Sequence, residues 1–183
     1  MRLRLAISAI ALLVATTNAV PSRRANELTL AGLRPGRDVA RTALQLYKKP
    51  NLHRQNEESE MDWESSCQKQ TLAVETDSSQ KIQTIRATEA DWVIGDCVPE
   101  APRPWRTGRG LRVWDSADRV NKLYGEPDSR SPSTKDGQRL ELLYYAFDWA
   151  GPDVPQVMEV LCTVEKDRKP GRVVEITLAA SSL

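Results

Sequence analysis

The sequence predicts an α+β protein made of two tandem helix–antiparallel sheet repeats, with the helices packed on one face of the sheet. A helix followed by a stopping proline occurs twice, as Leu46–Pro50 and, 77 positions later, Leu123–Pro127. A strand ending in an acidic turn also recurs, as Val74–Asp77 and, 90 positions later, Val164–Asp167. One such unit would bury too little surface to be stable alone, so the two are expected to share or adjoin a sheet.

Composition indicates a globular chain. Its 183 residues suffice for one ordinary domain or two small ones. Charged residues make up 28% and hydrophobic residues 40%, which is typical of a folded protein rather than a disordered one. The net charge is +1 and no concentrated basic patch is present. The sequence therefore does not favour binding to nucleic acid or to an anionic membrane surface.

Residues 1–19 have the pattern of a secretory signal peptide. A basic start is followed by the apolar run Leu5–Thr17 and by small residues up to Ala19. The alternative is a membrane anchor, but the run holds 13 residues, whereas about 20 are needed to span a bilayer. We therefore expect cleavage near Ala19, a secreted or periplasmic location and no transmembrane segment after cleavage.

The first repeat is expected over residues 28–87. Asp38 is placed to cap a helix over 39–49, and Pro50 prevents its continuation. The polar stretch that follows is expected to be a loop. Two short strands are then predicted, at 69–75 and 81–87.

A connector over 88–109, containing prolines and tryptophans, leads to the second repeat at 110–183. Asp115 is placed to cap a helix that Gly125 closes and Pro127 stops. A loop and three strands are predicted after this helix, at 129–138, 140–149, 156–165 and 172–179.

These motifs resemble a known module. A helix ending in Tyr-Gly-x-Pro (Tyr124–Pro127), followed by strands and a Val-x-x-Asp turn, resembles the unit of the beta-lactamase inhibitory protein and of the SmpA/OmlA outer-membrane lipoproteins. The resemblance implies protein binding through a sheet face or edge, and not catalysis. The chain departs from the lipoproteins because no Cys follows its apolar run, and Lys48 stands where the first copy would have the helix-closing glycine.

No catalytic set is indicated. His53 is the single histidine, and neither Ser65 nor Ser66 lies in a nucleophile elbow. The acids of 57–62 lack the spacing of a calcium loop and are interpreted as a solvated loop face. The backbone amides of Thr107–Gly110 could receive a phosphate, although a plain turn is the commoner arrangement. The sequence predicts no catalytic residue, metal or cofactor.

Three cysteines permit one disulfide. Cys162 occupies an inward position of a predicted strand and is interpreted as a small buried hydrophobe. The predicted bond is Cys67–Cys97, which would pin the connector to the first sheet. A zinc site is poorly supported, because no C-x-x-C pair exists.

Strand alternation predicts which face meets a partner. Met158, Val160, Cys162 and Val164 form one nearly apolar set, which should pack beneath the helix that carries Val120. The opposite set is too polar for a core and too apolar for an idle surface. The partner-binding residues predicted from it and its flanks are Trp149, Leu161, Val173, Glu159, Glu175 and Trp105.

Together these features favour an exported, non-catalytic protein-binding or envelope-associated module. Two alternatives remain at this point. One is a hydrolase of unknown type that uses the loop carboxylates, and the other is a purely structural envelope component. The sequence leaves the identity of a protein partner and the oligomeric state open.

Overall fold

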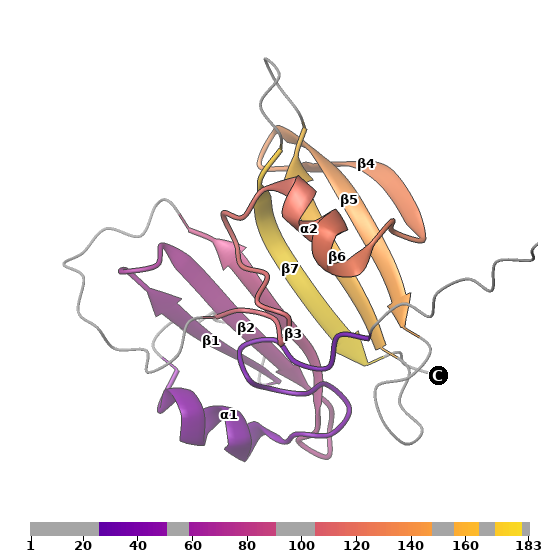
Figure 1. Cartoon of the computed structure of the whole chain (residues 1–183). Coiled ribbons are helices and arrows are strands. Elements are labelled where there is room, and N and C mark those ends of the chain that lie inside the picture. The colour runs from indigo at the N-terminus through magenta and orange to yellow at the C-terminus, as the bar shows by residue number, and fades with distance from the viewer. Residues whose placement is uncertain (1–25, 51–58, 91–104, 148–155, 165–170, 181–183) are drawn as a thin grey trace, which may run out of the picture.

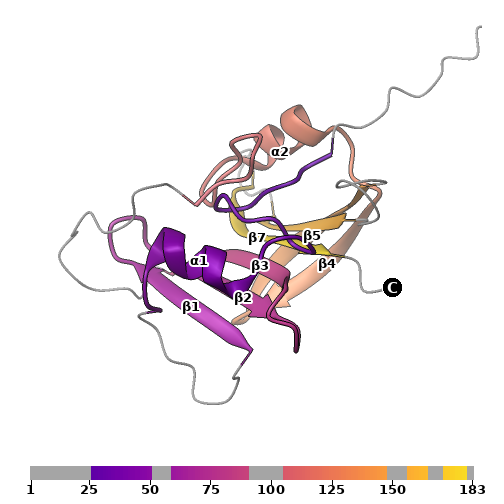
Figure 2. The ribbon, with the colours of Figure 1, turned by 90° about the horizontal axis from the view of Figure 1, so that it is seen from below.

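A computed structural model describes residues 26–50, 59–90, 105–147, 156–164 and 171–180. Within these ranges the chain forms one seven-stranded antiparallel sheet in the order β1-β2-β3-β7-β6-β5-β4, with two short helices on the same face (Figures 1 and 2). The elements are α1 (Ala40–Tyr47), β1 (Glu60–Ser65), β2 (Gln70–Thr76), β3 (Ile82–Glu89), α2 (Ala117–Tyr124), β4 (Ser129–Lys135), β5 (Gln138–Phe147), β6 (Gln156–Thr163) and β7 (Val173–Ala180).

This architecture overturns the predicted fold class. The molecule is not two tandem helix–sheet repeats, because most of its described residues belong to one continuous sheet. The pairing that creates it is β3 with β7, in which Ile85 lies opposite Leu178 and Ala87 lies opposite Ile176. A lone three- or four-stranded unit would expose an unpaired edge at this point, and the β3–β7 ladder removes both edges.

The two helices lie where the sequence predicts them, but their N-termini are stabilised differently. Val39 is the N-cap of α1 without a side-chain cap bond, and the Asp38 carboxylate instead accepts from the backbone N–H of Arg34 at 2.8 Å. Ser116, and not Asp115, caps α2 by accepting from the N–H of Arg119 at 3.3 Å. The Asp carboxylates before the two helices thus accept hydrogen bonds from backbone N–H groups that precede them in the chain, and not from the first turn of the helix.

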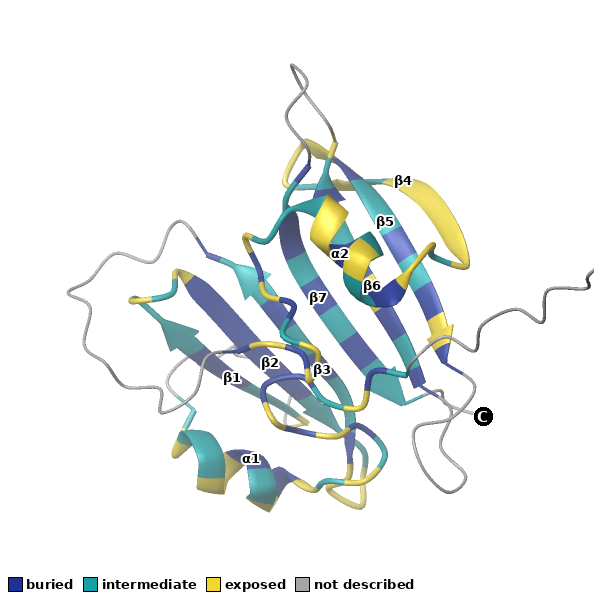
Figure 3. Cartoon of the chain, in the orientation of Figure 1, coloured by how far each residue is buried: buried dark blue, intermediate teal, exposed yellow. Residues whose placement is uncertain are grey.

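Sequence analysis predicted neither of the two edge strands, β1 and β4. β1 lies in the stretch interpreted as a polar loop, and β4 occupies the predicted Ser-Pro loop. β1 does alternate, with Met61 and Trp63 between acidic residues, and was overlooked because it is short and highly charged, whereas β4 carries no apolar alternation. The proline and charges of β4 also suit a strand that must not pair further. β4 is exposed over most of its length, as Figure 3 shows.

The core lies between the sheet and the helical side. Tyr124 of α2 contacts Tyr145 and Phe147 of β5 with ring centroids 5.8 and 6.3 Å apart. Val120 is fully buried in the same cluster, as the sequence predicts. Trp63 and Trp105 are also core residues, with 4% and 2% of their surface exposed. Trp105 is therefore not the exposed partner-binding residue expected from the sequence.

The structure corrects the face assignment of two further residues, one of them because of a β-bulge. The register between β6 and β7 shifts between Leu161 and Cys162, so that Cys162 lies opposite Val173. Val173 consequently turns to the core and is completely buried, rather than belonging to the outer face. Val164 lies just beyond β6 and is 54% exposed, although its strand parity predicts an inward position. Met158, Val160 and Cys162 are buried as predicted.

Neither described helix has the length or the apolar character that crossing a bilayer requires.

Candidate functional site

The β4 strand folds over the face of the sheet that is opposite to the helices, here called the far face. Lys135 Nζ, at the end of β4, lies 2.5 Å from Glu175 Oε2 on β7. Strands β5 and β6 separate β4 from β7 in the sheet order, which would place β4 about 14 Å away in a flat sheet. The contact therefore requires the edge to curl across the far face.

This curl encloses a cavity of about 390 Å³ between β4 and the far face. Strand parity places its floor opposite the core, since Leu161 and Glu175 alternate with the buried Val160 and Ile176. Its lining combines hydroxyl groups, three charged side chains and two apolar ones: Thr71, Ala73, Arg86, Thr88, Ser133, Thr134, Lys135, Leu161 and Glu175.

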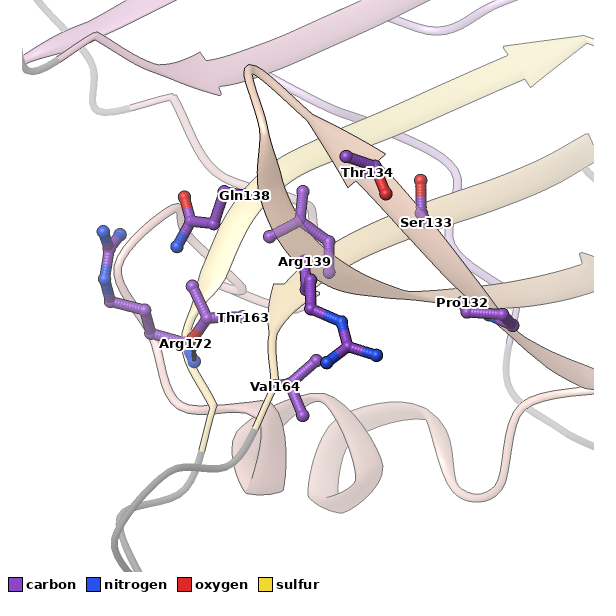
Figure 4. Close-up of a pocket in the computed structure, with 9 residues that line it drawn as sticks. Pro132, Ser133, Thr134, Gln138, Arg139, Thr163, Val164 and Arg172 are labelled. Carbon is purple, nitrogen blue, oxygen red and sulfur yellow. Dashed lines mark hydrogen bonds between the residues drawn. The ribbon is translucent and has the colours of Figure 1, made fainter.

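A second cavity of about 990 Å³ continues from the first at Ser133 and Thr134. Figure 4 shows Arg139 and Val164 between the β4 residues on one side and Thr163 with Arg172 on the other. The full lining is Pro132, Ser133, Thr134, Gln138, Arg139, Leu140, Thr163, Val164 and Arg172. The two cavities together are called the β4 groove.

Glu175 is the electrostatic centre of the inner cavity. Besides Lys135, its carboxylate accepts a hydrogen bond from Thr88 Oγ1 at 3.1 Å and lies 3.9 Å from Arg86 Nε. Arg86 also pairs with Glu75, at 3.2 Å. The Glu175 side chain is 15% exposed, so these contacts hold a largely buried charge.

Basic residues outnumber acidic ones along the groove. Arg86, Lys135, Arg139 and Arg172 line it, whereas Glu175 is the acid among the lining residues. Arg172 pairs with Glu89 outside the lining. Arg139 is exposed and makes no ion pair within the part of the chain that the structure describes.

The structure brings together some of the residues predicted to bind a partner. Leu161 and Glu175 line the inner cavity, and Glu159 is exposed on the same far face without lining it. Val173 and Trp105 are buried, and Trp149 lies outside the described residues.

The four basic residues of the groove were missed. Lys135 and Arg139 flank the Asp-Gly turn that the sequence does reveal, so their proximity to each other could have been anticipated. Their position over β7 could not, because it depends on the curl of β4.

A second polar cluster shows which anionic group the backbone amides of Thr107–Gly110 bind. The N–H groups of Gly108 and Arg109 donate to the Glu27 carboxylate, both at 3.0 Å. Glu27 also accepts from the N–H groups of Leu28 and Thr29 and from the Tyr124 hydroxyl at 2.7 Å. The anion that these amides receive is thus a side chain of the same protein, which is 2% exposed.

Burial and the neighbouring Glu27 charge raise the pKa of Tyr124 above its ordinary value. Tyr124 therefore remains a hydrogen-bond donor to Glu27 at neutral pH. Its oxygen also lies 2.7 Å from Thr107 Oγ1, which completes a buried chain of three polar side chains. All three side chains are nearly inaccessible to solvent, and the geometry of the cluster is that of a structural latch.

The remaining candidates concern cysteine, histidine and metal chemistry. Burial raises the pKa of the Cys162 thiol to about 12, and Cys162 is a free, buried cysteine. Cys97 and His53 lie outside the described residues, so the Cys67–Cys97 bond stays a prediction. Among the residues that are described, no group of three or more His, Cys, Asp or Glu side chains could hold a metal ion.

Comparison with known proteins adds little. No family model matches the chain, and no curated protein matches its sequence. The crystal structure of a DUF4309 family protein, YjgB, from Bacillus subtilis subsp. subtilis strain 168 is similar over 85% of this chain and 88% of that chain, with a TM-score of 0.47 and 11% identity. A likeness this distant supports no conclusion on function, and it does not bear on the resemblance to the inhibitory protein and lipoprotein module.

Proposed function

We propose that the chain is an exported, non-catalytic protein-binding module that receives an acidic segment of its partner in the β4 groove. The observation that carries the proposal is the charge of the groove. Four basic side chains and one acidic side chain line it, and Arg139 is exposed there without an ion pair to the described residues. Charge complementarity of this kind determines which partner is accepted more than how tightly it is held.

The chemistry of the lining favours a peptide segment over a small molecule. Small-molecule pockets are mostly apolar with a few polar groups. The β4 groove instead presents hydroxyl groups of Ser133, Thr134 and Thr163 beside its arginines. Leu140 and Val164 supply apolar contacts between them. An extended chain with carboxylate side chains can use both kinds of contact along a groove.

The single acid among the lining residues argues against paired-carboxylate hydrolysis in the β4 groove. A pair of carboxylates on either side of a scissile bond is the usual requirement for that chemistry. Glu175 is the acid that lines the groove, and its oxygens face Lys135, Arg86 and Thr88. These contacts hold the Glu175 carboxylate in place within the groove.

Export is the second part of the proposal and is based on residues 1–19, which lie outside the described residues. Its test is the intact mass of the protein isolated from its native host, which should lack the first 19 residues. Full-length protein recovered from the cytoplasm would contradict it.

The binding proposal is tested with three forms of the chain beginning at Val20, each immobilised and exposed to the exported fraction of the native host. Arg139→Glu reverses an exposed charge in the groove, whereas Arg41→Glu reverses an exposed charge on α1, which does not line the groove. The unaltered chain and Arg41→Glu should capture the same protein, and Arg139→Glu should not. Identical capture by all three forms would refute the proposal.

A further inference from the structure

Trp114 differs from the other two tryptophans that the structure describes. Trp63 and Trp105 belong to the hydrophobic core, whereas Trp114 is 39% exposed and lies outside the core cluster. Trp114 lies in the segment before α2. Its backbone N–H donates a hydrogen bond to the carbonyl oxygen of Val173 at 2.9 Å, which joins this segment to β7. Its side chain therefore needs an explanation other than packing of the interior.

The backbone conformation of Trp114 is also unusual. Its φ is +77°, and the N–H of Asp115 donates to the carbonyl oxygen of Arg112 at 3.3 Å, so Trp114 is the third residue of a β-turn. Positive φ at this position is the requirement of a type II turn, which glycine or asparagine normally meets. A bulky aromatic residue there is an outlier, and such outliers concentrate where function retains them.

The side chain of Trp114 contacts a residue of the β4 groove. The guanidinium carbon of Arg172 lies 4.3 Å from the centroid of the Trp114 ring, within the range of a cation–π interaction. Arg172 lines the larger cavity, and its Nη1 pairs with Glu89. In Figure 4 the Arg172 guanidinium points away from that of Arg139.

Two contacts thus fix the Arg172 guanidinium from different sides. A guanidinium has five N–H donors in a rigid plane, and its pairing with Glu89 through Nη1 leaves donors for a second carboxylate. The Arg172 side chain is 40% exposed, so those donors are accessible to an approaching group. Stacking on Trp114 holds the plane in one orientation before any partner arrives.

We propose that Trp114 is a positioning residue for partner binding: it holds Arg172 at the end of the β4 groove as an anchor for a carboxylate of an acidic peptide segment. This inference rests on the proposed function and adds a second anchor to Arg139. Glycine would adopt this turn conformation with less strain. Trp114 is retained there because its aromatic face is needed beside Arg172.

The test measures binding and stability in the same variants. The probe is a fluorescein-labelled peptide of ten glutamates, and its fluorescence anisotropy is followed with the chain beginning at Val20. Trp114→Asn suits the turn but removes the ring, and Trp114→Phe keeps an aromatic face. We expect Trp114→Asn to weaken binding at least fivefold with a melting temperature lowered by no more than about 2 °C, since a loss of about 1 kcal/mol lowers it by roughly 2–4 °C in a domain of 150–250 residues. Trp114→Phe should bind within twofold of the unaltered chain.

The outcomes separate the two proposals. Binding by the unaltered chain that Arg139→Glu abolishes and Trp114→Asn leaves unchanged would support the groove and overturn the role of Trp114. A melting temperature that falls further in Trp114→Asn would show that the ring is structural, which also overturns the inference. Absence of binding by the unaltered chain would overturn the acidic-segment proposal and this inference with it.

Discussion

The Glu27 carboxylate joins three segments that lie far apart in the sequence: the N-terminal segment, the Thr107–Gly110 turn and helix α2. Its two oxygens accept from four backbone N–H groups and from the Tyr124 hydroxyl. A Cβ atom added at Gly108 would lie 2.7 Å from Glu27 Oε1 and from Thr29 Oγ1, so the approach needs glycine at this place. The contact anchors the segment that carries the fully buried Leu30 and Leu33.

Glu27→Gln should therefore destabilise the protein strongly. The amide removes the charge and turns an N–H₂ group toward donors that are already committed. Hydrogen bonds to charged groups contribute about 1.5–3 kcal/mol each, so we predict a free energy of unfolding lower by about 2–4 kcal/mol. Urea denaturation measures it. The control Glu159→Gln, on the exposed far face, should change stability by less than about 0.5 kcal/mol. Equal effects of the two substitutions would contradict the latch.

The helix-closing residues Lys48 and Gly125 form a natural matched pair. Both have positive φ, +64° and +76°, with extended ψ, a combination that glycine adopts without strain. Lys48→Gly should raise the free energy of unfolding by about 0.5–1 kcal/mol, because the relief of strain exceeds the added entropy of the unfolded chain. Gly125→Ala should lower it by about 1 kcal/mol. Calorimetry that shows Lys48→Gly to be the less stable form would refute the strain argument.

At the scale of elements, the β4–β5 hairpin shapes the groove. Asp136 and Gly137, with φ of +50° and +76°, form its two-residue turn, and this pattern matches the twist of the two strands. β4 is an exposed edge that pairs with β5 alone. Its position over the far face is therefore fixed by the twist of the hairpin and by the contact of Lys135 with Glu175.

A double-mutant cycle of Lys135→Ala and Glu175→Gln measures that contact. The Lys135 side chain is 37% exposed, so solvent screens the pair, and we predict a coupling energy of about 0.5–1 kcal/mol. The coupling should shrink in 1 M salt, where the Debye length is about 3 Å. A coupling energy of zero at low salt would show that the hairpin holds its position without the ion pair.

Elements with local signals were predictable, and elements defined by their neighbours were not. The prolines and apolar spacing of residues 40–47 and 117–124 indicate helices, a turn signal separates β2 from β3, an apolar run indicates β5, and alternation indicates β6 and β7. β4 lacks apolar alternation because it is exposed over most of its length, and the alternation of Met61 and Trp63 in β1 was overlooked among its acidic residues. Val173 was assigned to the wrong face because a bulge is invisible in a regular two-residue period.

The same limit applies to the candidate site. Leu161 and Glu175 could be placed on the outer face from alternation alone. Arg86, Lys135, Arg139 and Arg172 join them only through the order of strands in the sheet and the curl of its edge. The role of Glu27 could not be anticipated, because the Gly108, Arg109 and Tyr124 groups that it joins lie about 80 or more positions away.

At the scale of the whole molecule, the three cysteines divide into two environments. Cys162 is buried in the core, and burial raises the pKa of its thiol from 9.0 to about 12. The folded protein therefore keeps this thiol protonated. The resulting stabilisation is complete below about pH 9 and is lost as the pH rises toward 12, because the unfolded chain releases the proton first.

Thiol counting tests this division together with the predicted Cys67–Cys97 bond. At pH 8 the folded, unreduced protein should show no reactive thiol, because Cys162 is inaccessible and protonated. Unfolding without reduction should reveal one thiol per chain, and reduction should reveal all three. Three thiols before reduction would exclude the disulfide, and a crosslinked peptide containing Cys162 would show that a different pair forms.

The place of β7 has a consequence for how the chain folds. β7 is the last strand in the sequence and the middle strand of the sheet, where it pairs with β3 on one side and β6 on the other. Neither side can complete its ladder until the C-terminal residues are available, and the β3–β7 pairing joins residues about 90 positions apart. Loop closure over such separations slows folding. A ribosome-bound chain that ends before Val173 would thus hold two unfinished half-sheets, so folding of the sheet must wait until β7 has been synthesised.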